Sequence, residues 1–218
     1  MAADFQGIPQ GAVDFYRELE VNNTREWWQA NRTRYQELVK EPFVALGEAV
    51  APAFGEPKVY RPNRDVRFSH DKSPYKRHQG LYVRSMTHAG WYLQCDATGY
   101  LIAGGSYFMA GDQLARYRSA VANDATGVQL EEILRELTDA GYEVRGEKLA
   151  TRPRGVAADA PRLELLRHKT IAAQLNLGEP EWMHTPEAAD YVNDGWDELR
   201  PLLGWLGEFV GDSEASRA

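Results

Sequence analysis

Three apolar runs separated by short turns constrain the fold of this chain most. The runs cover 80–86, 91–96 and 100–108, and the turns lie at 88–90 and 96–99. Short turns join neighbouring antiparallel strands, whereas parallel strands need a crossover of a dozen or more residues. This stretch therefore predicts an antiparallel meander rather than a strand–helix–strand unit.

Helical patterns lie on both sides of this meander. Apolar residues recur there at spacings of three and four, which is typical of amphipathic helices. The predicted parts are an N-terminal helical part at 11–52, a sheet at 58–108, helices at 112–140, a loop at 148–160 and C-terminal helices at 161–210. We expect one α+β domain over residues 1–218, with an antiparallel sheet of about five strands flanked by helices.

Composition excludes several classes of protein. A hydrophobic content of 43% is enough for a sizeable core and excludes a disordered chain. No stretch approaches the roughly 20 apolar residues of a membrane span, so we expect no membrane partner. Cys95 is the one cysteine, which rules out an internal disulfide. With no visible secretory signal, this favours the cytoplasm. The oligomeric state is left open.

A basic segment at 61–77 precedes the meander. It contains six Arg or Lys residues and only Asp65 and Asp71 as acids. Residues 58–84 carry eight basic and two acidic residues, a charge of +6, in a chain of net charge −7, which leaves −13 for the remainder. We interpret 64–69 as a strand, with Asp65 and Arg67 on one face. Asp65 then holds Arg67 in place and has a depressed pKa.

Charge alone leaves two readings of this segment open, a binding site and a solvated edge. The contrast in sign with the rest of the chain favours a site, as do polar groups able to orient a ligand. The predicted ligand-binding residues are Arg61, Arg64, Asp65, Arg67, Ser69, Lys72, Tyr75 and Lys76, completed by Asn31, Arg118 and Lys169. Instead of binding a ligand, Asn31 could form a structural hydrogen bond, and Arg118 could pair with a carboxylate.

No motif predicts a metal, a cofactor or a catalytic residue. The five histidines form no zinc pattern, so we expect no metal site. Gly104-Gly105 has neither the Walker nor the dinucleotide-binding spacing, and instead suggests a bulge or a close backbone approach. Ser69 and Ser73 have no identifiable base, so the catalytic residues are unknown.

Three readings of function follow. The first is a pocket for a small phosphate- or carboxylate-bearing molecule, in an enzyme or in a binding protein. The second is a non-enzymatic adaptor that grips an acidic protein or a nucleic-acid segment. The acidic total argues against a general nucleic-acid coat but not against a short segment. In the third reading the charges form internal salt bridges that fix the hairpin.

The whole chain resembles a bacterial and fungal family known as domain of unknown function 2461. Its opening motif is matched by Asn22-Asn23-x-Arg25-Glu26-Trp27, and its central signature by Arg61-x-x-Arg64-Asp65-x-Arg67-Phe68-Ser69-x-Asp71-Lys72-Ser73-Pro74-Tyr75-Lys76. Later matches are Gly105-Ser106-Tyr107 followed by Leu114 and Arg118, and Arg152-Pro153-Arg154-Gly155 leading to Asp159-x-Pro161 and Lys169. Met109-Ala110-Gly111 departs from the family, which usually has Pro soon after the strand tyrosine. The resemblance implies a family, and it implies no activity and no catalytic residue.

Overall fold

A computed structural model describes residues 5–67 and 70–214. The chain divides into two compact units. Unit 1 comprises 1–83, 92–102 and 176–194, and unit 2 comprises 84–91, 103–175 and 195–218. In the described residues no helix is both long and apolar enough to cross a membrane.

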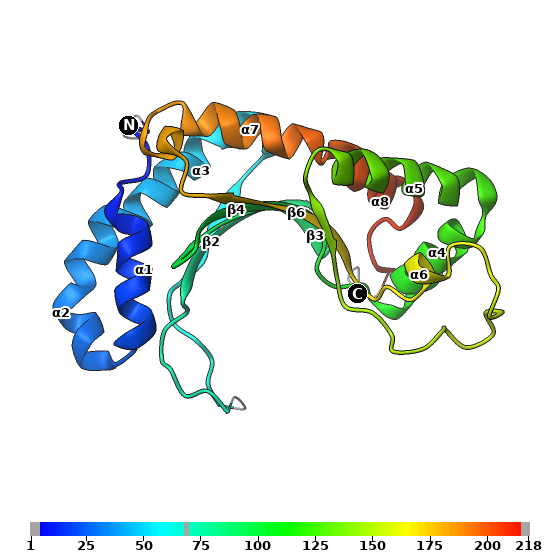
Figure 1. The fold of residues 1–218 in the computed structure, drawn as a ribbon, viewed down its shortest axis with the longest axis horizontal. Coiled ribbons are helices and arrows are strands. Elements are labelled where there is room, and N and C mark those ends of the chain that lie inside the picture. The colour runs from blue at the N-terminus through cyan, green and yellow to red at the C-terminus, as the bar shows by residue number, and fades with distance from the viewer. Residues whose placement is uncertain (1–4, 68–69, 215–218) are drawn as a thin grey trace. The chain divides into compact units, whose positions relative to one another are not determined.

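The N-terminal part of unit 1 is helical, as predicted. Thr24 caps the second helix, because its hydroxyl accepts a hydrogen bond from the Trp27 amide at 3.2 Å. Figure 1 shows the first two helices as a hairpin. The elements are α1 (Gly11–Val21), α2 (Arg25–Tyr35), a π-helical segment η1 (Gln36–Lys40) and α3 (Glu41–Phe54).

Six strands form one antiparallel sheet in the order β1-β2-β3-β4-β6-β5. The α+β class is therefore confirmed, with one strand more than expected. The meander at 80–108 is confirmed as β2, β3 and β4. The strands are β1 (Pro57–Val59), β2 (His78–Met86), β3 (Ala89–Asp96), β4 (Gly99–Ser106), β5 (Glu143–Arg145) and β6 (Ile171–Gly178).

Helix α3 lies directly on the sheet in unit 1. A Cβ atom on Gly47 would lie 3.0 Å from the Pro57 side chain and 3.1 Å from Leu81, so the absence of a side chain permits this close approach. Phe43, Leu46 and Val50 on the same helix are fully buried. Burial of such side chains contributes roughly 1.5–3 kcal/mol each, which anchors α3 and the π-helical segment before it.

The helices of unit 2 surround Trp205 and Tyr117. Their rings lie 6.0 Å apart at 81°, and both are buried. The Tyr117 hydroxyl donates to the Leu165 carbonyl at 3.0 Å. The remaining helices are α4 (Gly111–Ala122), α5 (Asp124–Asp139), α6 (Leu163–Leu166), a 3₁₀ turn η2 (Glu181–His184), α7 (Ala188–Glu198), which passes from unit 1 into unit 2, and α8 (Arg200–Phe209).

The expectation of helix throughout 161–210 was wrong at its start. Between residues 161 and 170 only α6 is helical, and β6 follows. Strand β6 is held by pairing with β5, with Val144 opposite Ala173. Gly105 of β4 also lies so close that an added Cβ would be 2.4 Å from the Ala172 Cα. This confirms the close backbone approach expected at Gly104-Gly105. Long-range pairing here overrides local helical periodicity.

Candidate functional site

The basic segment forms a long loop between β1 and β2, and the strand expected at 64–69 is absent from its described part. The two arms of the loop pair at its base. There the Arg64 amide donates to the Pro74 carbonyl at 2.9 Å, and the Lys76 amide donates to the Pro62 carbonyl at 2.7 Å. Pro62 and Pro74 have no amide hydrogen, and Asp65 accepts from the Arg67 amide at 3.2 Å. Such local side-chain bonds compete with a strand ladder. Ser69 lies outside the described residues.

Acidic neighbours pair with two of the predicted cations. The Arg67 guanidinium contacts the Asp65 carboxylate at 2.6 Å, which confirms the predicted pair, and Arg64 contacts Asp71 at 2.5 Å. The Arg67 side chain holds the pKa of Asp65 below its usual value, as predicted. The Ser73 hydroxyl and amide, then Arg64, lower the pKa of Asp71. The two aspartates thus offset two of the six positive charges of the segment.

Other predicted residues have partners of their own. The Lys72 ammonium donates to the Val66 carbonyl at 3.0 Å. Asn31 donates to the Trp27 carbonyl at 2.9 Å and accepts from Arg34 at 2.8 Å, so it fixes its own helix. In unit 2, Arg118 donates to the Leu166 carbonyl at 3.4 Å and Lys169 pairs with Glu147. A binding role for these residues stays a prediction.

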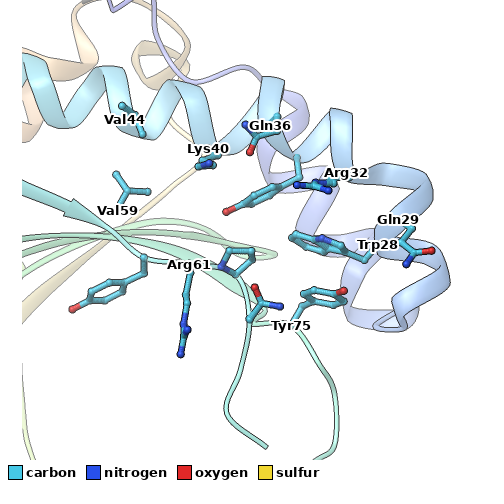
Figure 2. A pocket seen from close by; sticks show the side chains of 13 residues that line it. Trp28, Gln29, Arg32, Gln36, Lys40, Val44, Val59, Arg61 and Tyr75 are labelled. Atoms are coloured by element: carbon cyan, nitrogen blue, oxygen red, sulfur yellow. The ribbon is translucent and has the colours of Figure 1, made fainter.

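A cavity of about 590 Å³ lies in unit 1 beside the base of this loop. We call it the Arg61 pocket. Figure 2 shows residues of α2, η1 and α3 along one side, with Val59, Arg61 and Tyr75 on the other. Its lining residues are Trp28, Gln29, Arg32, Tyr35, Gln36, Lys40, Val44, Val59, Tyr60, Arg61, Pro62, Asn63 and Tyr75.

Three of these lining residues are cations. Arg32, Lys40 and Arg61 are exposed, and none forms a hydrogen bond or ion pair through its side chain with any residue in 5–67 or 70–214. No Asp or Glu lines the cavity in this part of the chain. A concave surface with one sign of charge concentrates ions of the opposite sign. The pocket is therefore electrostatically suited to an anion.

The π-helical segment helps to place these side chains on one wall. Trp28, Arg32, Gln36, Lys40 and Val44 recur every four residues. A four-residue step overshoots an α-helical turn by roughly 40°, so four steps would rotate Val44 by roughly 160° from Trp28. The turn of η1 is wider than an α-helical turn and is closed by a hydrogen bond from the Glu41 amide to the Gln36 carbonyl. It therefore reduces the rotation between Trp28 and Val44. Single π turns of this kind are frequent at functional sites.

An aromatic cluster forms the buried part of the lining. The rings of Trp28 and Tyr75 stack 4.1 Å apart at 11°, and Tyr35 lies 4.8 Å from Trp28. The Tyr35 hydroxyl donates to Gln79 at 2.7 Å, and Gln79 donates to the Tyr60 carbonyl at 2.8 Å. This network fixes the backbone next to Arg61.

Asn23 ties the loop to the helical hairpin. Its side-chain amide donates to the Tyr75 carbonyl at 3.0 Å, and its carbonyl accepts from the Tyr75 amide at 3.2 Å. The side chain therefore replaces a strand partner for Tyr75. This contact holds the Tyr75 ring against Trp28 at one end of the Arg61 pocket.

Beside the pocket lies a second group of positive charges around Tyr60. The Lys76 ammonium lies 5.0 Å from the centre of the Tyr60 ring. Partial burial lowers the pKa of Lys76, and the nearby charges of Arg61 and Lys58 lower it further. Three like charges are thus brought close together around Tyr60.

The described residues hold no group of three or more His, Cys, Asp or Glu side chains arranged to bind a metal ion. Cys95 is fully buried in β3, and burial raises the pKa of its thiol. The interpretation of Cys95 as a core residue is confirmed. Its thiol has neither the exposure nor the lowered pKa of a reactive cysteine.

A family model described as "Conserved hypothetical protein (DUF2461)" matches residues 11–205. The chain belongs to this family. No curated protein and no solved structure matches it. The segments that resemble the family's opening motif and central signature contact each other in the structure, because the Asn23 side chain bonds to the backbone of Tyr75. The recognition of DUF2461 from sequence is confirmed.

The prediction from sequence included only part of the Arg61 pocket. Arg61 and Tyr75 line it, whereas Arg32, Gln36 and Lys40 were not identified as candidates. A signal for them existed in the four-residue recurrence from Trp28. It was masked by the apolar stripe of Trp28, Tyr35 and Val39, which marks the buried face of the same helices.

Proposed function

We propose that this DUF2461 protein binds a small anionic molecule, bearing phosphate or carboxylate, in the Arg61 pocket. The observation that supports the proposal is the lining itself, in which the side chains of Arg32, Lys40 and Arg61 form no ion pair with the described residues. Charge-assisted hydrogen bonds from such groups contribute about 1.5–3 kcal/mol each when a ligand covers them. The anion is the missing partner of these three side chains.

Size and shape support the same class of ligand. Sites for small molecules usually enclose about 300–1,000 Å³, and the pocket falls inside that range. Its aromatic wall offers apolar contact to the body of the ligand, and Gln29, Gln36 and Asn63 offer neutral hydrogen-bonding groups. We propose an anion with an apolar or flat body rather than a bare inorganic ion as the physiological ligand.

Positive charges held together without partners are unfavourable for folding. Repulsion of this kind acts on Lys76, because the charges of Arg61 and Lys58 lower its pKa. Functional sites commonly retain such unfavourable arrangements, which lower the stability of the protein but favour binding. A bound anion would relieve the repulsion, so ligand binding is expected to raise the melting temperature.

Isothermal titration calorimetry with citrate and with phenyl phosphate, at low salt, tests the proposal. We expect measurable binding of at least one of these probes. Arg32→Gln, Lys40→Gln and Arg61→Gln should each weaken it by roughly tenfold, because each removes one charged contact worth about 1.4 kcal/mol or more.

Arg67→Gln is the matched control, since Arg67 belongs to the same loop but pairs with Asp65. It should leave the affinity unchanged. Absence of binding by both probes would contradict the proposal, as would an equal loss of affinity in Arg67→Gln. A steep preference for oligonucleotides over both probes would favour the adaptor reading instead.

A further inference from the structure

Strand β1 lies at the edge of the sheet and pairs on one side only. It is the first strand in the sheet order, so β2 is its one strand partner among the described residues. Just after β1, the Tyr60 amide donates to the Gly80 carbonyl at 2.9 Å, and the Tyr60 carbonyl accepts from the Gln79 side chain at 2.8 Å. The Pro62 carbonyl accepts from the Lys76 amide at 2.7 Å. Tyr60 and Pro62 therefore direct their backbone groups inward, to the arm of the chain that contains β2.

The backbone groups of Val59 and Arg61 point the other way. In an antiparallel pair the direction of the backbone groups alternates from one residue to the next, so the neighbours of Tyr60 direct theirs away from β2. Val59 lies opposite Leu81, which makes this a pair without hydrogen bonds. Outside β2, no residue in 5–67 or 70–214 forms a backbone hydrogen bond with Val59 or Arg61. The outer edge of this segment is therefore available for pairing.

This outer edge borders the Arg61 pocket. A run of consecutive residues, 59–63, lines the cavity. Side chains of an extended segment alternate between two faces, so a cavity on one face would be lined by every second residue. Only an edge of the segment is common to the whole run. Because the inner edge is already paired at Tyr60, the pocket lies along the outer edge.

The opposite wall of the pocket suits an extended peptide that carries negative charge. Figure 2 shows Arg32, Gln36 and Lys40 on the helices across from Val59 and Arg61. Lys40 follows Arg32 by eight residues, a rise of about 12 Å along the helix axis. An extended peptide covers that length with about four residues, at roughly 3.4 Å each. Carboxylate side chains on alternate residues of such a peptide lie on one face and can point to these cations.

We propose that the anion bound in the Arg61 pocket is a short acidic peptide that adds to the outer edge of β1 as a further strand, an inference that rests on the proposed function. The peptide backbone pairs with the N–H and C=O groups of Val59 and Arg61. Its carboxylates pair with Arg32 and Lys40. In this mode of recognition the backbone hydrogen bonds supply affinity, and the side chains on alternate residues supply specificity.

Amide hydrogen exchange, measured by NMR for single residues, tests the strand addition. The probe is an end-blocked tetrapeptide of alternating glutamate and valine, and citrate is the matched anion without a peptide backbone. We expect the peptide to slow exchange of the Val59 and Arg61 amides about tenfold when about 90% of the protein is occupied. Citrate should leave both rates unchanged. The Tyr60 amide, which bonds to Gly80, is the internal control and should change little with either probe.

Methylated peptides test the same point without any change to the protein. Alternate residues of an added strand direct their amides to β1, so N-methylation at both glutamates and at both valines should have different effects. One of the two should weaken binding about tenfold, because it removes two hydrogen bonds, and the other should leave it nearly unchanged. Replacing both glutamates by glutamine should also weaken binding about tenfold. Equal affinity of the two methylated peptides, or undiminished binding of the glutamine peptide, would overturn the proposal.

These results separate strand addition from the proposed function. If citrate or phenyl phosphate binds but the peptide does not, or binds without slowing exchange at Val59 and Arg61, only strand addition is refuted. If no anion binds, the pocket is refuted and strand addition with it. Slow exchange at both residues that increases with protein concentration, without peptide, would show that a second copy of the chain occupies the edge instead. A peptide that slows exchange at both residues and is displaced by citrate supports both proposals.

Discussion

At the scale of single residues, charge pairing decides which cations are available to a ligand. Arg64 and Arg67 are cations of the basic segment, but each lies against an aspartate of the same loop. Arg32, Lys40 and Arg61 form no ion pair with the described residues, although the charge of Arg61 contributes to the lowered pKa of Asp65. The sequence shows how many charges a segment holds, whereas their pairing depends on turn geometry that Asp65 and Asp71 themselves create.

His78 makes the stability of the protein depend on pH. Burial lowers the pKa of this imidazole, and the Lys76 charge lowers it further, while Asp96 raises it. A lowered pKa in the folded state means that the unfolded chain binds more protons, so stability rises with pH. The full contribution is present above the unfolded pKa of about 6.5 and is lost as the pH falls below it.

We therefore expect the free energy of unfolding of the wild type, from urea titration, to fall between pH 7.5 and pH 5.5. His78→Gln should reduce this fall but not abolish it, because burial also lowers the pKa of His168. His70→Gln, at an exposed loop position, is the control and should behave like the wild type. An unchanged pH dependence in His78→Gln would refute this account of His78.

At the scale of elements, one side chain couples the helical hairpin to the loop. Asn23 precedes α2 and makes two hydrogen bonds to the backbone of Tyr75. Asn23→Ala should cost about 1–3 kcal/mol of unfolding free energy, since it leaves the backbone groups of a buried residue without these bonds. It should also weaken binding of any anion in the Arg61 pocket, because Tyr75 lines that cavity.

Urea titration and calorimetry measure the two effects of Asn23→Ala. Asn22→Ala is a close control, since the Asn22 side chain donates to the Glu18 carbonyl at the end of α1 rather than to the loop. If both variants lose the same stability and neither loses affinity, the link between hairpin and pocket is not functional.

The elements were predictable from sequence where local pattern agrees with tertiary pairing. The meander was predicted because short turns at His88 and Gly99 leave few alternatives, and both residues have positive φ angles of 64° and 119°. Strand β6 was missed because its partners are distant in sequence. The π-helical segment is likewise invisible to a 3.6-residue pattern, so the wall formed by Arg32, Gln36 and Lys40 was not foreseen.

At the scale of the whole molecule, four strands run from one compact unit into the other. They are β2, β3, β4 and β6, each of which has residues in both units. Strands shared in this way favour cooperative unfolding of the two units. The single domain expected from sequence stays a prediction, and the cooperativity of unfolding tests it. We expect one urea midpoint for tryptophans in both units.

Fluorotryptophan NMR measures this directly, with Trp27 reporting on unit 1 and Trp205 on unit 2. Trp→Phe variants assign the resonances. Coincident midpoints support one domain, whereas two midpoints separated beyond error would show two independently stable domains.

The central claim is that an anion completes the charge of the Arg61 pocket. Anomalous diffraction from crystals soaked in selenate, an anion that can be located by its selenium atom, tests it most directly. The account predicts a peak within hydrogen-bonding reach of Arg61 and of Arg32 or Lys40, which disappears in Arg61→Gln crystals. Selenate found only at Arg64 and Arg67, or at none of these residues, would contradict it.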